Sequence, residues 1–435
     1  MPDGTGRADA GTRRRRTGRS GHREENAIET EDGVVGDATR PVRDEDAFDV
    51  AAVDGWLRTA LTGSAPGAEV APGVLGSARA ELPPGLPVVR QFPGGASNLT
   101  YLLRYGPLGA GQGSGEGSGE GSDAVRELVL RRPPHGARGG SAHDMGREFA
   151  LQAALRPVFP LVPAMVVHGT DTAVLGAEFY VMERLTGTIL RSDVPDELAA
   201  ALTPAAVDEL CGRAVDVLGA LHDVDVAATG LDRFGRGGDS VARQVAGWTR
   251  RYAAARTPDV PDFAEVTAWL EAERPADVGS CLVHNDFRFD NLVLHGDPRA
   301  GRPFEVAGVL DWELATVGDP LCELGSALAY WVQADDEPAF RASRRQPTHL
   351  PGMWTRQQVV EGYAARRGLA VDAGSWRFYE VFGLFRLAVI AQQIWARFVT
   401  GATTNPAFAA LGPMVGLLEQ RCRQVVEHGP VGWDA

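Results

Sequence analysis

The hydrophobic pattern of this 435-residue chain changes its period at Gly187, and this change limits the fold more than any other feature. Before Gly187, short runs rich in β-branched and aromatic residues are typical of strands. After it, apolar residues recur every three or four positions over long runs, which is typical of amphipathic helices. This order predicts an α+β protein with a bilobal arrangement: a small antiparallel β lobe over residues 46–187 and a larger, mainly helical lobe over residues 188–435.

Most elements of the two lobes can be placed from these runs. Turn residues mark their ends, as where Thr62 and Gly63 follow the first helical run. We expect strands at Val88–Phe92, Leu99–Tyr105, Glu127–Arg131, Met165–Val167 and Phe179–Met182. We expect helices at Asp49–Leu61, Ser141–Pro157, Val207–Leu221, Val241–Ala254, Leu321–Trp331 and Phe378–Phe398.

Two segments have compositions that cannot bury enough apolar surface to fold. Residues 1–45 are rich in Gly, Arg, Asp and Glu, and we expect a disordered tail there. We interpret its run Arg13–Arg16 as a solvated part of that tail rather than a contact for nucleic acid or membrane. Residues 109–122 repeat Gly, Ser and Glu, which predicts a flexible loop between two strands of the small lobe.

Composition also limits the partners. The formal net charge of -14 disfavours a nucleic-acid footprint over the whole surface. No window offers the ~20 uncharged apolar residues of a membrane span. The four Cys stand at no metal-ligand or redox spacing, and no apolar stretch follows the N-terminal arginines as a secretion signal requires. We therefore expect a cytoplasmic protein without a nucleic-acid or membrane partner.

The chain contains no Lys, so all 43 basic residues other than His are Arg. Schiff-base chemistry through lysine and the Gly-Lys-Ser/Thr phosphate loop are therefore excluded. Any side-chain cation that binds phosphate must be Arg.

The strongest chemical signal lies in residues 282–313. Asp286 and Asn291 stand in a loop between two short apolar β segments, and Asp311 follows the next apolar run. Since a hairpin can return Asp311 to that loop, we expect one amide oxygen and two carboxylates to converge. Such oxygen ligands suit a hard cation such as Mg²⁺, with one carboxylate left to orient a hydroxyl group.

This arrangement resembles the His-x-Asp-x-x-x-x-Asn catalytic loop and the metal-binding Asp of the protein-kinase-like fold, in the small-molecule branch typified by aminoglycoside phosphotransferases. The resemblance implies a small-molecule kinase that uses ATP and Mg²⁺, with Asp286 as catalytic base and Asn291 and Asp311 as Mg²⁺ ligands. It further implies that the catalytic loop is supported by His284, Arg288 and Asp319.

Three further residues receive structural interpretations. Asp319, in a Gly-Asp-Pro stretch, is expected to hold the catalytic loop by hydrogen bonds. His222 is interpreted as a packed histidine at a helix end, and Cys281 as a buried, inert thiol.

The resemblance assigns the nucleotide side of the site to the small lobe. It places four residues of one turn over the nucleotide phosphates, namely Gly94, Gly95, Ser97 and Asn98. Arg131 takes the place of the family's strand lysine, with Arg132 as an open alternative, and Glu148 takes that of its orienting partner. The main-chain groups of Glu183 and Leu185 are implied to pair with adenine.

A narrower resemblance covers residues 48–401. Leu130–Pro134, Ala142–Asp144, His284–Arg288 and Phe385–Ile394 are similar to the phosphotransferase branch associated with acyl-CoA dehydrogenases. This branch implies a hydroxyacyl-CoA or a related hydroxy acid as the acceptor. Two alternatives stay open: a pseudokinase that only binds nucleotide or acyl-CoA, and an aminoglycoside-modifying kinase. The sequence also leaves open which arginines surround the acceptor, among Arg288, Arg344, Arg345, Arg386 and Arg397.

Overall fold

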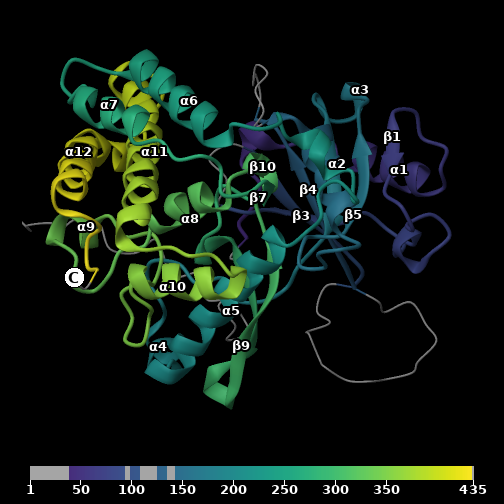
Figure 1. Cartoon of the computed structure of the whole chain (residues 1–435). Helices are drawn as coiled ribbons and strands as arrows, with labels where there is room; N and C mark the ends of the chain where they lie inside the picture. Colours follow the sequence, from purple (N-terminus) through teal and green to yellow (C-terminus); the bar gives the residue numbers. More distant parts are fainter. Residues whose placement is uncertain (1–38, 94–97, 108–124, 135–142, 434–435) are drawn as a thin grey trace, which may run out of the picture. The chain divides into compact units, whose positions relative to one another are not determined.

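The computed structural model describes residues 39–93, 98–107, 125–134 and 143–433 (Figure 1). Within them, the small lobe is an antiparallel sheet with the strand order β1-β5-β6-β4-β3-β2. Its strands are β1 (Ala68–Val70), β2 (Val88–Gln91), β3 (Leu99–Tyr105), β4 (Arg126–Arg132), β5 (Met165–Gly169) and β6 (Phe179–Glu183). All five predicted strands are present, and β1 is an unpredicted edge strand that pairs with β5.

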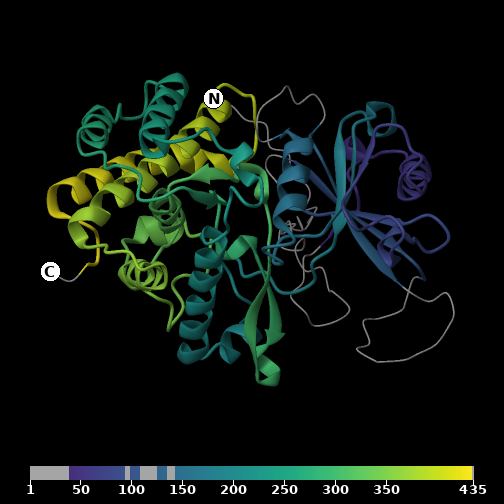
Figure 2. The ribbon, with the colours of Figure 1, turned by 45° about the vertical axis from the view of Figure 1, so that its right-hand side comes forward.

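Helices α1 (Val50–Leu61) and α2 (Met145–Leu155) cover opposite faces of this sheet (Figure 2). Trp56 of α1 packs against Phe179, with ring centroids 5.0 Å apart. On the other side, Glu148 of α2 accepts a hydrogen bond from the hydroxyl of Tyr180. Because successive strand residues point to opposite faces, neighbours in β6 meet different helices. The sheet thereby presents α2 and its buried carboxylate to the inner side of the lobe.

Two hydrophobic cores meet at α2. The core of the small lobe extends from Val53 to Met182 and includes Phe149 of α2. The core of the helical lobe begins with Leu151 and Leu155 of the same helix. One helix therefore supplies side chains to both lobes.

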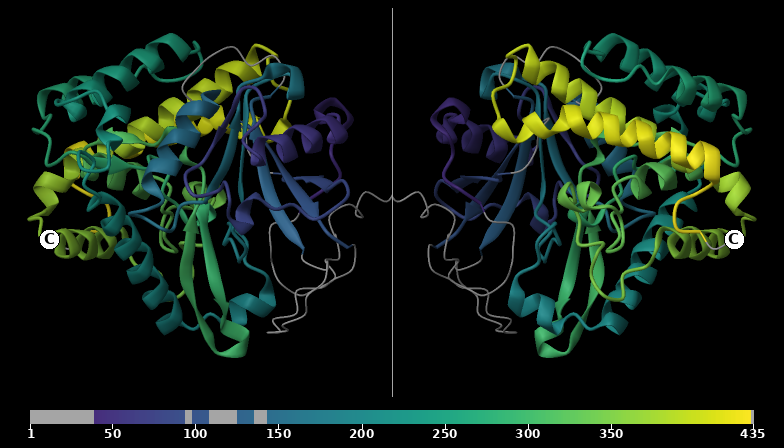
Figure 3. Two further views of the ribbon diagram at one scale, coloured as in Figure 1. Left: turned by 90° about the vertical axis from the view of Figure 1, so that its right-hand side faces the viewer. Right: turned by 90° about the vertical axis from the view of Figure 1, so that its left-hand side faces the viewer.

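The helical lobe follows the predicted helices and adds several more. Its helices are α4 (Asp196–Ala201), α5 (Pro204–His222), α6 (Ser240–Ala255), α7 (Ala264–Ala272), α8 (Pro320–Leu328), α9 (Pro338–Ala342), α10 (Arg356–Arg367), α11 (Ala373–Val399) and α12 (Leu411–His428). Helices α11 and α12 lie side by side (Figure 3). The expected helices near α5, α6, α8 and α11 are confirmed within a few residues.

Two short pairs of antiparallel strands carry the polar loops that the sequence singled out. β7 (Cys281–Val283) pairs with β10 (Thr316–Gly318), and β8 (Leu292–Asp297) pairs with β9 (Arg302–Val309). The loop from β7 to β8 and the loop from β9 to β10 therefore leave the same small region of the lobe. This register brings the two candidate loops together.

The predicted disordered tail is wrong at its end, because residues 39–45 are part of the fold. The main chain of Arg40 pairs with that of Gln91, and the guanidinium of Arg43 lies 2.6 Å from a carboxylate oxygen of Asp46. These long-range contacts supply the stabilisation that the local composition lacks. The earlier part of the tail and the Gly-Ser-Glu loop at 109–122 lie outside the described residues.

No helix in the described part of the chain is both long enough and apolar enough to cross a membrane.

Candidate active site

Asp286 lies in the loop between β7 and β8, where neighbouring side chains hold its carboxylate. The Nδ2 of Asn291 donates to Asp286 Oδ2 over 2.9 Å and to the main-chain oxygen of Asp286 over 2.8 Å. The Nε of Arg288 lies 2.9 Å from Asp286 Oδ1, and the guanidinium stacks 4.7 Å from the ring centroid of Tyr330. Asp286 is thus oriented by two side chains of its own loop.

His284 is fully buried and ties the catalytic loop to the next one. Its Nε2 lies 2.8 Å from the main-chain oxygen of Leu310, while its Nδ1 accepts from the N–H of Asp286 over 3.2 Å. A carbonyl on one nitrogen and an amide donor on the other require the neutral imidazole with the proton on Nε2. The ring packs edge-on against Trp312. These contacts leave His284 as a bracing residue rather than a proton acceptor for substrate.

Asn285 has a backbone conformation that residues other than Gly rarely adopt. Its φ of 65° lies in the left-handed region. Its N–H donates to Glu323 Oε1 over 2.6 Å, and its main-chain oxygen accepts from the guanidinium of Arg386 over 2.7 Å. Its side-chain Nδ2 donates to the main-chain oxygen of Leu314 over 3.0 Å. Tertiary contacts therefore impose the conformation that precedes Asp286.

The carboxylate that holds the loop belongs to Glu323, which corrects the role expected of Asp319. Glu323 Oε2 accepts from the N–H of His284 over 3.0 Å and lies 2.7 Å from Nε2 of His222. Asp319 instead caps α8 through the N–H groups of Leu321 and Cys322 and accepts from Val278. Asp319 is the N-cap of α8, so its carboxylate binds N–H groups of the first turn. Glu323, one turn later, faces the catalytic loop.

Glu323 and His222 form a buried polar pair. Burial alone would raise the pKa of Glu323, but the hydrogen bond and the charge of His222 outweigh it and lower that pKa. The other ring nitrogen of His222 lies 2.6 Å from the hydroxyl of Tyr363. The histidine that the sequence suggested as packing at a helix end therefore also anchors the carboxylate that supports the catalytic loop.

Asn291 and Asp311 face one cavity with oxygen atoms that suit Mg²⁺. Because Nδ2 of Asn291 faces Asp286, its Oδ1 lies on the opposite side of the amide. Asp311 has a φ of 66° and follows β9. Among the described residues, no three His, Cys, Asp or Glu side chains gather as a metal site. An amide and a carboxylate nevertheless fit Mg²⁺, which commonly completes its shell with phosphates and water.

Arg131 on β4 stands among three carboxylates. Its Nη2 lies 2.7 Å from Asp311 Oδ1 and 2.7 Å from Glu313 Oε2, and its Nη1 lies 3.5 Å from Glu148 Oε1. Burial alone would raise the pKa of Asp311, but Arg131 holds it below its ordinary value. Burial is also the largest influence on Glu148, and it raises that pKa even beside Arg131.

Arg132 points away from this site and does not compete for the same place. Its guanidinium donates to the hydroxyl of Tyr101 and to the main-chain oxygens of Asp46 and Leu175. Only 1% of the residue is exposed. Of the two neighbouring arginines, Arg131 alone reaches the carboxylates of Asp311 and Glu313.

The structure describes only some of the other residues that the sequence assigns to the nucleotide side. Asn98 donates from Nδ2 to Glu313 Oε2 over 3.0 Å, and its Oδ1 lies 3.0 Å from Nδ1 of His143. Glu183 and Leu185 line the same cavity as Asp286. The N–H of Glu183 donates to the main-chain oxygen of Ala164 over 2.9 Å, so its carbonyl is the group on which the expected adenine contact depends. The other predicted turn residues, Gly94, Gly95 and Ser97, lie outside the described residues.

One cavity of about 1010 Å³ joins the nucleotide side to the helical lobe. Three of the five undecided arginines line it, namely Arg288, Arg345 and Arg397. The other two have structural contacts: Arg344 lies 3.3 Å from Asp193, and Arg386 binds the main chain of the catalytic loop. Apolar residues of α11 and α12 form the opposite wall.

The sequence model described as "Phosphotransferase enzyme family" matches residues 88–367. The chain belongs to this family. The chain is similar to acyl-CoA dehydrogenase family member 10 of Mus musculus, with 34% identity over 316 residues that cover 72% of this chain and 27% of that protein. It is also similar to acyl-CoA dehydrogenase family member 11 of Homo sapiens, with 31% identity, 73% of this chain and 37% of that protein. The chain thus spans well under half of these relatives.

Solved structures confirm the bilobal kinase-like fold of the phosphotransferase. A protein of Ralstonia eutropha JMP134 assigned as an aminoglycoside phosphotransferase superposes with a TM-score of 0.63 and 26% identity, covering 87% of this chain and 99% of its own. Choline kinase of Cryptosporidium parvum Iowa II gives a TM-score of 0.51 with 10% identity, covering 87% of this chain and 97% of its own, which supports the fold alone.

Sequence reasoning missed several residues of the phosphotransferase site. Gln346 is buried, accepts from the N–H of Phe289 over 2.8 Å and donates to the main-chain oxygen of Tyr330 over 3.3 Å. Glu313, whose Oε2 lies 2.7 Å from Nη2 of Arg131, was not assigned a role. A glutamine in a polar loop carries no local signal, whereas Glu313, two residues after the metal-loop aspartate, could have been proposed from its spacing.

Proposed function

We propose that this phosphotransferase transfers the γ-phosphoryl group of ATP to a hydroxyl group on an anionic acceptor with an apolar chain, such as a hydroxyacyl-CoA or a hydroxy acid. One observation carries the proposal. A single cavity contains Asp286, Asn291 and Asp311 at one part and an apolar wall with Leu387 and Met414 at another. A hydroxyl at Asp286 can therefore belong to a molecule whose chain rests on that wall.

Each polar residue has a role that its contacts support. Asp286 would orient the acceptor hydroxyl and take its proton as the new bond to phosphorus forms. Arg131 would bind the nucleotide phosphates, steadied by Glu148 behind it. Asn291 and Asp311 would hold Mg²⁺, which neutralises charge on the transferred phosphoryl group when it is bound. Positioning and fixed charge, rather than a covalent intermediate, would then lower the barrier.

The charges near the acceptor favour an anion over a polycation. Arg288, Arg345 and Arg397 line the cavity, and Arg345 and Arg397 are exposed to incoming ligand. Arg side chains bind phosphate and carboxylate groups well and would repel the ammonium groups of an aminoglycoside. The names of the relatives, acyl-CoA dehydrogenase family members, point to the same acyl-CoA chemistry.

The test is a mass-spectrometric search for a phosphorylated product with Mg-ATP. Acceptor pools of 3- and 4-hydroxyacyl-CoAs, free hydroxy acids and aminoglycosides are compared for the wild type, Asp286→Ala and a control, Asp297→Asn, whose carboxylate lies outside the cavity. We expect a phosphorylated hydroxyacyl product from the wild type and the control only. A phosphorylated aminoglycoside would overturn the acceptor class. Nucleotide binding without any product would favour the pseudokinase, and full activity of Asp286→Ala would remove the assigned base.

A further inference from the structure

The acceptor side of the cavity continues into an apolar arm. Its walls come from α11, α12 and residues 330–346, which we call the wall segment. The side chains of the arm that the argument uses are Val332, Phe340, Leu387, Ile394, Met414 and Leu418. An arm with this lining would bind an aliphatic chain by removing it from water.

Phe340 separates this arm from a second, much smaller void. That void has a volume of about 20 Å³. Its lining includes Trp331 and Trp376 and the charged side chains of Asp336, Arg356, Glu380 and Arg421. Phe340, Val332 and Ala329 line both spaces, so they form the partition between them. Removing the Phe340 ring would join the two spaces and lengthen the arm.

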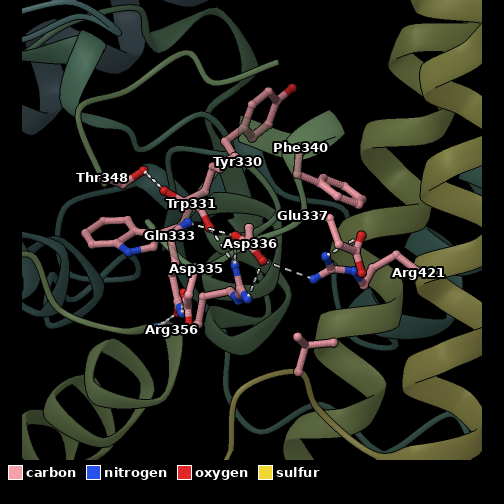
Figure 4. A network of polar contacts seen from close by, with 12 residues as sticks. Tyr330, Trp331, Gln333, Asp335, Asp336, Glu337, Phe340, Thr348, Arg356 and Arg421 are labelled. Atoms are coloured by element: carbon pink, nitrogen blue, oxygen red, sulfur yellow. Dashed lines mark hydrogen bonds and ion pairs between the residues drawn. The ribbon is translucent and has the colours of Figure 1, made fainter. Parts of the chain in front are cut away.

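A buried ion-pair network holds the ring of Phe340 from behind (Figure 4). The guanidinium of Arg421 on α12 lies 4.3 Å from the centroid of the Phe340 ring. Arg421 lies 3.3 Å from Asp336, which also accepts two hydrogen bonds of 2.7 and 3.0 Å from Arg356 on α10. Two cations on two helices thus fix the carboxylate of the wall segment. The ring is a rigid end wall because both its own packing and its anchor are buried.

The wall segment is also tied to the catalytic loop at both ends. Tyr330, its first residue, stacks under Arg288, which pairs with Asp286. Gln346, its last residue, accepts from the N–H of Phe289. The end of the arm is therefore held at a set distance from the proposed catalytic carboxylate.

We propose that Phe340 is the specificity-determining residue that sets the longest acyl chain the acceptor site admits, with Asp336 and Arg421 as its positioning residues. This inference rests on the proposed function, since it takes the acceptor to be an acyl chain with its hydroxyl at Asp286. The wall segment then acts as a ruler from the reacting hydroxyl to the end of the chain.

The test measures binding without phosphoryl transfer. Saturated acyl-CoAs of increasing length, from butyryl-CoA to palmitoyl-CoA, are titrated into the full chain by calorimetry. For the wild type, affinity should rise about fourfold per methylene group and stop rising once the chain reaches Phe340. In Phe340→Ala the rise should continue for at least about two more carbons, and in Phe340→Trp it should stop earlier. In Asp336→Asn the chain length at which affinity stops rising should be less sharply defined, because Asp336 no longer fixes Arg421 against the Phe340 ring.

Controls separate this effect from general loosening and from failure of the proposed function. Phe304→Ala removes an equally buried ring that lines neither space and should leave the break unmoved. If Phe340→Ala does not fold, Phe340→Leu should give a smaller shift in the same direction. An unmoved break in folded Phe340 variants, or no binding of acyl-CoA by the wild type, would overturn the inference. A shifted break, together with no phosphorylated product from the hydroxyacyl-CoA pools of the mass-spectrometric search, would support the inference and contradict the proposed kinase activity instead.

Discussion

Replacing Glu323 with Gln tests whether the catalytic geometry is imposed from outside the catalytic loop. The Glu323 carboxylate accepts from the N–H groups of His284 and Asn285 and lies 2.7 Å from His222 Nε2. A glutamine has one acceptor oxygen and one NH₂ group, so the NH₂ must face at least one of these donors. The variant therefore leaves a buried N–H or the imidazole of His222 without its partner.

The expected magnitudes follow from these three contacts. A hydrogen bond to a charged group contributes about 1.5–3 kcal/mol, and breaking a buried charged pair costs about 3–5 kcal/mol. We expect the free energy of unfolding to fall by about 3–5 kcal/mol. Because Asn285 is then free to leave its left-handed conformation, Asp286 moves with it. A displacement of about 1 Å at a reacting group can lower kcat about 100-fold.

Urea unfolding and single-turnover phosphoryl transfer check both parts, with Glu361→Gln as the control because that side chain is exposed on α10. The folded pKa of Glu323 is lowered, so its stabilising contribution is present above the ordinary glutamate pKa and is lost as pH falls through the folded value. The stability difference between wild type and variant should therefore shrink in acid. An Glu323→Gln protein with wild-type kcat would refute the claim that this carboxylate positions Asp286.

Two further predictions concern the cations. Arg131→Met leaves Glu148 and Asp311 without their shared partner. Nucleotide affinity should therefore fall about 10- to 100-fold, and the free energy of unfolding by about 3–5 kcal/mol. Arg131→Lys should lie between this variant and the wild type, as measured by equilibrium nucleotide binding and urea unfolding. Chelation of divalent cations should abolish transfer yet leave the melting temperature unchanged, because the proposed ligands Asn291 and Asp311 would hold Mg²⁺ together with the nucleotide phosphates and not as a part of the folded chain alone. A lowered melting temperature in chelator would contradict that reading.

Local pattern was enough for most strands and for the position of the catalytic loop, because those features depend on residues close in the sequence. Local pattern could not decide whether Arg131 or Arg132 faces the site, because every residue from Leu128 to Arg132 is buried. A strand covered on both faces has no alternation of polar and apolar residues from which to read direction. Only the pairing of β4 with β3 and β6 decides which arginine faces the cavity.

The support of the catalytic loop was harder to predict for a related reason. Glu323 and Arg386 reach the loop from α8 and α11, and His222 of α5 holds Glu323. Each of these contacts joins residues far apart in the chain. Asp319 was expected to hold the loop because it stands in a Gly-Asp-Pro stretch. The helix that starts at that aspartate consumes its carboxylate, and one turn of helix carries the next acid to the loop.

Helix α2 gives the two lobes a common mechanical element. Phe149 is packed in one core, Leu151 and Leu155 in the other, and Glu148 stands beside them as the partner of Arg131. Any widening of the cleft must therefore bend or drag this helix, and the charge behind the nucleotide cation moves with it. A packing change at Leu155, which does not line the cavity, would be felt as a change in phosphate affinity. The rate of amide hydrogen exchange along α2 would then report the opening of the cleft between the lobes.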